Sequence, residues 1–226
     1  MKTDYIAHDR EYQKRRAKGN AGWDDADTIR ENVVILTEAF AAAHFPRHGR
    51  LLEMGCGAGD MSLGLAALGY DVSGVDIAPS AIAWAQDKAR ERGLTADFRV
   101  GDVLDLVHYT DDSFDIVLDG HCLHCIIGED RHKFLAAARR VLKPGGLLHV
   151  NTMCGENFMR RFPEQSDPAT RCQVINGIAL RYFGRAEDTV AEVSAAGFEI
   201  VQAAVVPRPD DYSEDMLLID ARKPSE

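Results

Sequence analysis

Short apolar segments alternate with amphipathic segments along most of this 226-residue chain. In the amphipathic segments, apolar residues recur three or four positions apart, the spacing that places them on one face of a helix. The short apolar segments end at glycine, proline or acidic residues, which is typical of buried parallel strands. This pattern predicts helices over residues 8–18, 27–44, 59–68, 79–92, 129–142 and 187–196, and strands over residues 51–53, 70–76, 97–100, 114–119, 147–151, 198–206 and 216–221.

The alternation of strands and helices predicts an α/β domain with a mostly parallel sheet. The length suits one such domain with additions. Two helices precede the first strand, so residues 1–46 are predicted to form a helical cap of the same domain, and residues 47–226 its main body. The pattern is lost over about residues 154–185; a loop of this length in a compact domain is usually functional, so we expect a lid there.

Composition narrows the class of protein. Hydrophobic residues make up 46 % and charged residues 27 %, which is ordinary for a soluble globular domain. The formal net charge of −10 would repel a nucleic acid, so no nucleic-acid partner is expected. The polar start and the lack of a membrane-spanning apolar segment favour a cytoplasmic protein without a membrane partner. Five cysteines form an odd set, which argues against a disulfide scaffold.

The chemistry is expected where the first predicted strand meets the next helix. Residues 51–60 read LLEMGCGAGD, and the three alternate glycines remove Cβ atoms from a sharp turn. A dinucleotide site needs the spacing G-x-G-x-x-G, but Asp60 and Leu63 stand where the third glycine would fall. A P-loop is excluded because no Gly-Lys-Ser/Thr follows. Glu53 and Asp60 would repel a phosphate, so a cationic ligand without phosphate is favoured.

Three further acids end or follow predicted strands. Asp76 closes the second strand about 20 residues after the glycines, where a carboxylate can accept two hydrogen bonds from a ribose. Asp102 follows the third strand and Asp119 ends the fourth. Ligands of parallel sheets bind beyond the carboxyl ends of the strands, so we expect these acids to surround one pocket.

Together, these residues resemble motif I and the strand-end acids of the class I S-adenosylmethionine-dependent methyltransferases, and the chain is similar to the small-molecule members of type 11. The turn Lys143-Pro144-Gly145-Gly146 before the fifth strand strengthens the resemblance. The resemblance implies a Rossmann-like seven-stranded sheet of strand order 3-2-1-4-5-7-6 with helices on both faces. It also implies S-adenosyl-L-methionine as the cofactor.

The same resemblance implies a role for each motif residue. Glu53 is expected at the amino-acid end of the cofactor, Asp76 at the ribose, and Asp102 with its neighbour at the adenine. Asp119 would flank the methionine portion. The full set of expected cofactor-binding residues is Glu53, Gly55, Cys56, Gly57, Gly59, Asp76, Ile77, Asp102, Val103, Asp119 and Gly120.

The segment after the fourth predicted strand is expected to face both the cofactor and the acceptor. Residues 120–125 read GHCLHC, and histidine can take a proton from a hydroxyl, thiol or amine near neutral pH. His121 and His124 are therefore the catalytic candidates, with a pocket-lining or bracing role as the alternative for each. No metal is expected, since one short segment can hardly supply four ligands and no second Cys/His pair is evident.

The methyl acceptor is expected to be a small molecule, because no large added domain is evident for a macromolecule. Tyr5, Tyr12 and Trp23 of the cap either line the pocket or pack the cap onto the core. Arginines of the predicted lid either bind an anionic acceptor bidentately or are solvated; they are Arg160, Arg161, Arg171, Arg181 and Arg185. Three alternatives stay open: an RNA or protein methyltransferase, a non-catalytic cofactor-binding subunit, and an NAD-dependent oxidoreductase.

Overall fold

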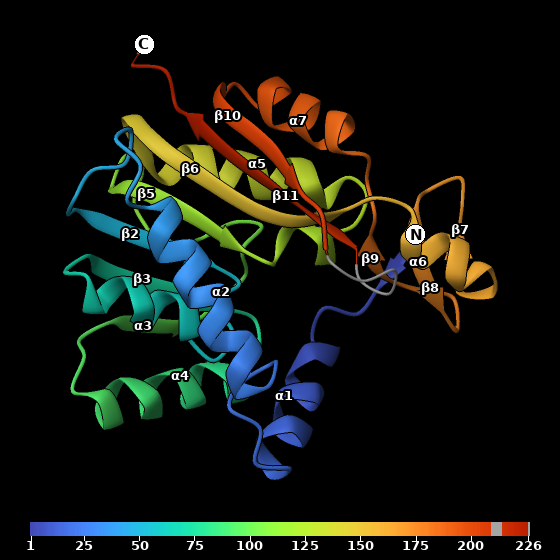
Figure 1. Ribbon diagram of the computed structural model, residues 1–226, viewed down its shortest axis with the longest axis horizontal. Helices are drawn as coiled ribbons and strands as arrows, with labels where there is room; N and C mark the ends of the chain where they lie inside the picture. Colours follow the sequence, from blue (N-terminus) through green and yellow to red (C-terminus); the bar gives the residue numbers. More distant parts are fainter. Residues whose placement is uncertain (209–213, 226) are drawn as a thin grey trace.

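The computed structural model describes residues 1–208 and 214–225. Its main sheet has seven strands in the order β10-β11-β6-β5-β2-β3-β4 (Figure 1). Read from the other edge, this is the predicted order 3-2-1-4-5-7-6. β11 is antiparallel to both neighbours and the other pairs are parallel, so the predicted fold class is confirmed. The strands are β2 (Arg50–Met54), β3 (Asp71–Asp76), β4 (Asp97–Val100), β5 (Phe114–Gly120), β6 (Leu142–Cys154), β10 (Glu199–Val206) and β11 (Asp215–Arg222).

Helices cover both faces of this sheet, as predicted. α2 and α3 pack on the face turned toward the viewer in Figure 1, and α4 packs beside α3. α5 and α7 share the core on the opposite face. The bounds are α2 (Ala26–Ala39), α3 (Asp60–Ala67), α4 (Pro79–Arg92), α5 (Asp130–Val141) and α7 (Ala186–Ala195).

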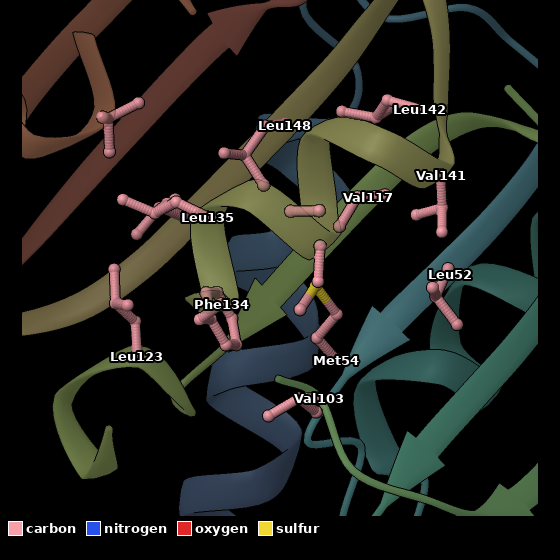
Figure 2. Packing of buried hydrophobic residues seen from close by; sticks show 14 of the residues in the cluster. Leu52, Met54, Val103, Val117, Leu123, Phe134, Leu135, Val141, Leu142 and Leu148 are labelled. Carbon is pink, nitrogen blue, oxygen red and sulfur yellow. The ribbon is translucent and has the colours of Figure 1, made fainter. Parts of the chain in front are cut away.

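Side-chain alternation along β2 explains how both faces are buried. Leu51 joins the cluster that contains Leu36 and α3, whereas its neighbour Leu52 joins the cluster on the α5 face. Figure 2 shows this second cluster, where Leu52 and Met54 lie on the same side as Phe134. Successive strand residues point to opposite faces, so an apolar strand with helices on both sides is the stable arrangement.

The second predicted helix is shorter than expected. α2 ends at Ala39 rather than near His44, and residues 40–46 turn back against the sheet. Phe40 and Phe45 stack with their ring centroids 4.4 Å apart, and both are buried. A continuous helix would place residues five apart on different sides, so this stacking requires the chain to leave the helix.

The predicted lid is not an irregular loop. It contains α6 (Asn157–Arg161), the single turn η2 (Pro163–Gln165) and the strands β7 (Ser166–Asp167), β8 (Cys172–Ile175) and β9 (Ile178–Tyr182). These strands form a second sheet of order β1-β9-β8-β7, in which β1 (Lys2–Thr3) pairs with β9 in parallel. In Figure 1, β1 lies near α6 at the N terminus, and α1 (Ala7–Ala17) follows it in the chain. The N terminus and the lid are therefore one structural unit.

Candidate active site

A cavity of about 450 Å³ lies beyond the carboxyl ends of β2, β3 and β5. Its size is within the usual range for ligand pockets. The strand ends form one part of its wall, and α1, the α1–α2 connection and the small sheet form the other. The wall contains these predicted site residues: Glu53, Gly55, Cys56, Gly57, Asp76, Ile77, Asp102, Val103, Gly120, His121 and His124. Gly59 and Asp119 are not part of it.

The first two glycines of the motif expose bare backbone to the cavity. Gly55 and Gly57 have φ values of 73° and 51°, in the left-handed region that favours glycine. A Cβ on Gly55 would lie 2.5 Å from the sulfur of Cys122, and a Cβ on Gly57 would overlap the hydroxyl of Tyr12. Any side chain at these positions would therefore clash with Cys122 or Tyr12, so only glycine lets these two residues pack this closely against the motif.

Gly59 and Asp119 act behind the wall. Gly59, with a φ of 76°, is the N-cap of α3, and a Cβ there would lie 2.9 Å from the ring of Phe98. Asp119 is fully buried, and its Oδ1 accepts hydrogen bonds of 2.8 Å from the backbone N–H groups of Cys122 and Leu123. Burial raises the pKa of Asp119 to about 7. Both residues shape the site, and a direct cofactor contact for either stays a prediction.

Asp76 binds the glycine motif as well as facing the cavity. Its Oδ2 accepts a hydrogen bond of 2.9 Å from the backbone N–H of Gly57, and its Oδ1 accepts one of 2.9 Å from that of Ala78. Burial raises the pKa of Asp76, and these two hydrogen bonds oppose that shift. The carboxylate is thus fixed at the end of β3, with Ile77 beside it in the wall.

Glu53 is a buried carboxyl group at the end of β2. Its Oε2 accepts hydrogen bonds from the backbone N–H of Ser62, at 2.9 Å, and from the hydroxyl of the same residue. Burial is the main cause that raises the pKa of Glu53 to about 8. Its Oε1 lies against Gly120, where a Cβ would come within 2.6 Å of it. The glycine at position 120 therefore leaves room for this carboxyl oxygen.

Asp60 carries less free negative charge than the sequence suggested. The Nζ of Lys88 lies 2.7 Å from both carboxylate oxygens, and the lysine side chain is only 8 % exposed. Since this ion pair neutralises Asp60, the repulsion of a phosphate inferred from that residue is not supported. The acidic character of this end of the cavity comes instead from Glu53, Asp76 and Asp102.

Asp102 and Val103 lie in the wall where the chain leaves β4. The Oδ1 of Asp102 accepts a hydrogen bond of 2.8 Å from the backbone N–H of Leu104, which fixes the local turn. Val103 belongs to the main hydrophobic core, and Figure 2 shows it near Met54. The position expected for the adenine is therefore anchored in the core.

The segment after β5 is held from two sides. Leu123, in the short helical turn η1 (Leu123–Cys125), is fully buried near Phe134 (Figure 2). The Nη1 of Arg131 donates a hydrogen bond of 2.7 Å to the carbonyl of Leu123. The same guanidinium pairs with both carboxylate oxygens of Glu192 and lies 4.3 Å from the ring centre of Tyr182. Arg131 thus connects α5, η1, α7 and β9.

The two candidate histidines differ in their surroundings. His121 has a φ of 75°, and its Nε2 is buried without a hydrogen-bond partner among the described residues. Burial, aided by the charge of Arg208, lowers the pKa of His121 to about 4. His124 is 3 % exposed, its Nδ1 lies 3.5 Å from the hydroxyl of Thr152, and burial lowers its pKa well below the ordinary value. His121 therefore has an uncommitted nitrogen.

The cap forms part of the cavity wall. Tyr5, Tyr12 and Trp23 line the cavity, which favours the first of the two roles considered for them. The sequence predictions did not include four further cap residues of the wall, His8, Arg15, Asp24 and Asn32, or Met153 of β6. A signal for two of them existed: His8 and Arg15 lie four and three residues from Tyr12, on the same face of α1.

The arginines of the predicted lid do not act together. Of the five, the described wall includes Arg181 alone. Arg171 instead joins parts of the lid, since its guanidinium binds the carbonyls of Gly155 and Phe183 at 2.8 Å and the carboxylate of Glu156 at 3.0 Å. Arg160 is exposed.

The described ranges show neither a metal-binding cluster nor a membrane-spanning helix. Over residues 1–208 and 214–225, no group of three or more His, Cys, Asp or Glu side chains is arranged to hold a metal ion. Within the same ranges, no helix is long and apolar enough to cross a membrane.

Comparison with known proteins bears on this site. Residues 52–150 match the family model described as "Methyltransferase domain", of type 11. A ubiquinone biosynthesis O-methyltransferase from Cereibacter sphaeroides is 38 % identical over 128 residues, which cover 56 % of this chain and 51 % of that protein. A protein of the same name from Xanthomonas axonopodis pv. citri is 33 % identical over 150 residues, covering 65 % of this chain and 62 % of that protein. The chain thus spans about half to three fifths of the length of these relatives.

Solved structures extend the similarity over most of the chain. A SAM-dependent methyltransferase from Methanosarcina mazei has a TM-score of 0.68 at 26 % identity, covering 81 % of this chain and 96 % of that one. A 1,6-didemethyltoxoflavin-N1-methyltransferase from Burkholderia thailandensis has the same fold, with a TM-score of 0.67 at 23 % identity over 95 % of this chain and 84 % of that one. The fold is thus that of the class I S-adenosylmethionine-dependent methyltransferases. Within this fold, residues 52–150 match a type 11 methyltransferase domain, in agreement with the predicted resemblance.

Proposed function

We propose that this protein is an enzyme that transfers a methyl group from S-adenosylmethionine to an oxygen, nitrogen or sulfur atom of a small molecule. The observation that carries the proposal is that one cavity is lined both by the expected cofactor-binding residues and by candidate acceptor-binding residues. The glycine motif and the strand-end acids face one end of it, and His121 and Arg181 face the same space. A cofactor and an acceptor would therefore meet in one enclosure.

The residues of the wall fit this cofactor. Gly55 and Gly57 line the cavity without side chains, so a ligand can approach their backbone closely. Glu53 suits an ammonium group, Asp76 suits a ribose diol, and the end of β4 suits an adenine. A bound ammonium group would favour ionisation of Glu53, and the ionised carboxylate disfavours a phosphate-bearing ligand. When bound, S-adenosylmethionine supplies a methyl group that its sulfonium makes electrophilic.

His121 is the better candidate for a general base. Its lowered pKa keeps the imidazole neutral at pH 7, the residue lines the cavity, and its buried Nε2 has no hydrogen-bond partner among the described residues. A neutral imidazole can accept the proton of a hydroxyl, amino or thiol group as that group is methylated. His124 is packed against Thr152 and suits a bracing role. Much of the remaining rate enhancement would come from alignment of the reactants and exclusion of water, which the cap favours.

A small acceptor is supported by the size of the cavity, which would have to hold both ligands. The relatives named for O-methylation in ubiquinone biosynthesis favour an oxygen acceptor. The net charge of −10 argues against a nucleic-acid acceptor, and we expect the protein to act in the cytoplasm.

The test is calorimetric titration of the purified protein with S-adenosylmethionine, S-adenosylhomocysteine and, separately, NADH. We expect micromolar binding of both sulfur ligands and none of NADH. Transfer of a radiolabelled methyl group to members of a small-molecule library would then identify the acceptor. Binding of NADH in preference, or no binding of either sulfur ligand, would contradict the proposal. Cofactor binding without transfer to any acceptor would instead favour a non-catalytic subunit.

A further inference from the structure

Charge is unequally distributed along the cavity. Glu53, Asp76 and Asp102 lie at the cofactor end, and Asp60 is paired with a lysine. The wall contributed by the cap and the small sheet carries Arg15 and Arg181, with Asp24 as its carboxylate. In a chain of net charge −10, an excess of positive charge inside a cavity indicates a ligand group of the opposite sign.

Arg181 is the guanidinium available to such a ligand. It lies on β9, which packs directly against η1, so its side chain reaches the segment that carries the two histidines. Its side chain hydrogen-bonds the thiol of Cys125, and its charge acts on His124. Within residues 1–208 and 214–225, no carboxylate lies within ion-pair distance of it. A guanidinium has five N–H donors, so most of those of Arg181 are free for a planar anion.

The other charged groups near Arg181 either contact other side chains already or act on the cavity only through longer-range electrostatics. The Nε of Arg15 lies 3.4 Å from Glu11, and its guanidinium stacks over Trp23 at 4.4 Å. Asp24 interacts electrostatically with Arg15, then with Arg181 and Arg208. Arg208 also acts on His121. Asp25 adds a second carboxylate near Asp24, and Arg15 is shared with Glu11. Arg181 is therefore the arginine of this wall that has no carboxylate at ion-pair distance among the described residues.

A second, independent observation points to a ligand in the same space. The Nε2 of His121 is buried without a partner among the described residues, and its backbone is in the left-handed region at φ 75°. A buried polar atom without a partner is costly, and strained backbone tends to persist at functional sites. His121 and Arg181 both line the cavity, and the ring centroids of His121 and His124 are 6.3 Å apart.

We propose that the acceptor end of the cavity recognises a small organic carboxylate through Arg181, with the hydroxyl, amino or thiol group to be methylated directed at His121. This inference rests on the proposed methyltransferase function and names the substrate class. The carboxylate would be bound bidentately, which fixes the orientation of the acceptor as well as its charge. A neighbouring anion would also favour protonation of His121 as it takes up the acceptor's proton.

The test uses the full chain saturated with S-adenosylhomocysteine, which blocks turnover. Paired acids and amides of nearly equal shape are titrated by calorimetry: benzoate with benzamide, salicylate with salicylamide, and caffeate with caffeamide. Tyramine serves as a cationic comparison. The variants are Arg181→Gln, Arg181→Lys and the matched control Arg160→Gln, which removes an exposed arginine of the same lid outside the cavity.

We expect at least one acid to bind about tenfold or more tightly than its amide, the ratio expected for a charge-assisted hydrogen bond. Arg181→Gln should remove this preference without changing the affinity for the amide or for S-adenosylhomocysteine, Arg181→Lys should retain part of it, and Arg160→Gln should retain all of it. Equal binding of acids and amides, binding of no acid, tighter binding of tyramine, or an unchanged preference in Arg181→Gln would each overturn the inference. Failure of S-adenosylhomocysteine to bind the unmodified protein would instead refute the proposed function.

Discussion

The hydroxyl of Tyr12 lies so close to the backbone of Gly57 that a Cβ on the glycine would overlap it. Tyr12 belongs to α1 in the cap, and Gly57 to the glycine motif after β2. Burial raises the pKa of Tyr12, so its hydroxyl remains protonated and can donate a hydrogen bond. The cap therefore reaches the motif itself, and a substitution at this contact should affect cofactor binding.

Gly57→Ala is expected to weaken S-adenosylhomocysteine binding about tenfold or more. Its new methyl group would displace the Tyr12 hydroxyl, a residue of the cavity wall, and a left-handed alanine costs about 1–2 kcal/mol. Gly19→Ala is the matched control, because Gly19 has a φ of 78° but no atom lies near its missing Cβ. Calorimetry measures the loss of cofactor affinity in both variants, and urea unfolding measures their loss of stability. The comparison separates the clash with Tyr12 from the cost of a left-handed alanine. Equal losses of affinity in both would show that backbone strain alone is responsible.

Asp76→Ala is expected to lower the affinity for S-adenosylmethionine by about tenfold or more, because hydrogen bonds to a charged group contribute about 1.5–3 kcal/mol. Asp71→Ala, at the exposed start of the same strand, should leave that affinity unchanged. Calorimetric titration measures both. An unchanged affinity in Asp76→Ala would remove this residue from the cofactor site.

The pKa of Glu53 predicts how stability depends on pH. The folded protein holds the Glu53 proton up to about pH 8, whereas the unfolded chain releases it near pH 4.5. Folding therefore takes up a proton in this window, and the free energy of unfolding should fall as pH rises through it. Asp119, raised from 3.8 to about 7, contributes in the same direction. Urea unfolding across this range should show a shallower decline in Glu53→Gln, and identical slopes would contradict the assignment.

The same group predicts proton release when the cofactor binds. A bound ammonium favours the ionised form of Glu53, so the affinity for S-adenosylmethionine should increase with pH up to about pH 8. Titration in buffers of different ionisation enthalpy measures the released proton. The effect should be absent in Glu53→Gln; a pH dependence that survives this substitution would assign the proton to another group.

His121→Asn is expected to lower kcat for the identified acceptor by about a hundredfold or more, the usual contribution of a general base. Binding of S-adenosylmethionine should not change. His124→Asn should act mainly on stability, because this ring is packed against Thr152. The pH dependence of the rate provides a second readout, since its acidic limb should disappear in His121→Asn alone. A full rate in that variant would exclude the proposed base.

Arg131→Met is expected to destabilise the protein by about 3 kcal/mol or more, because it leaves buried carbonyls and Glu192 without their partner. Arg139→Met is the control on the same helix, since Arg139 is only partly buried and makes one longer hydrogen bond of 3.3 Å, to Gly197. Urea unfolding compares them. Equal, small losses in both would show that Arg131 does not hold the segment after β5.

The main sheet was predictable because its signals are local. The glycine at position 93 has a φ of 63° and ends α4 where the pattern places the end of a helix. The acids at the ends of β3 and β5 mark the edge where ligands of such sheets bind. The small sheet was not predictable, because β1 and β7 have two residues each and gain their stability from partners far along the chain.

By itself, the sequence determined the class of fold, the strand order implied by the family resemblance, and the positions of the glycine motif and of Asp76, Asp102 and His121. These features follow from periodicity, backbone freedom and charge, all of which are properties of neighbouring residues. Only the tertiary structure decided that Lys88 neutralises Asp60, that the Nε2 of His121 lacks a partner among the described residues, and that Arg181 is the lid arginine of the described wall. Each of these facts depends on burial and on contacts between segments that are distant in the chain. The spacing of neighbouring residues encodes neither burial nor such contacts.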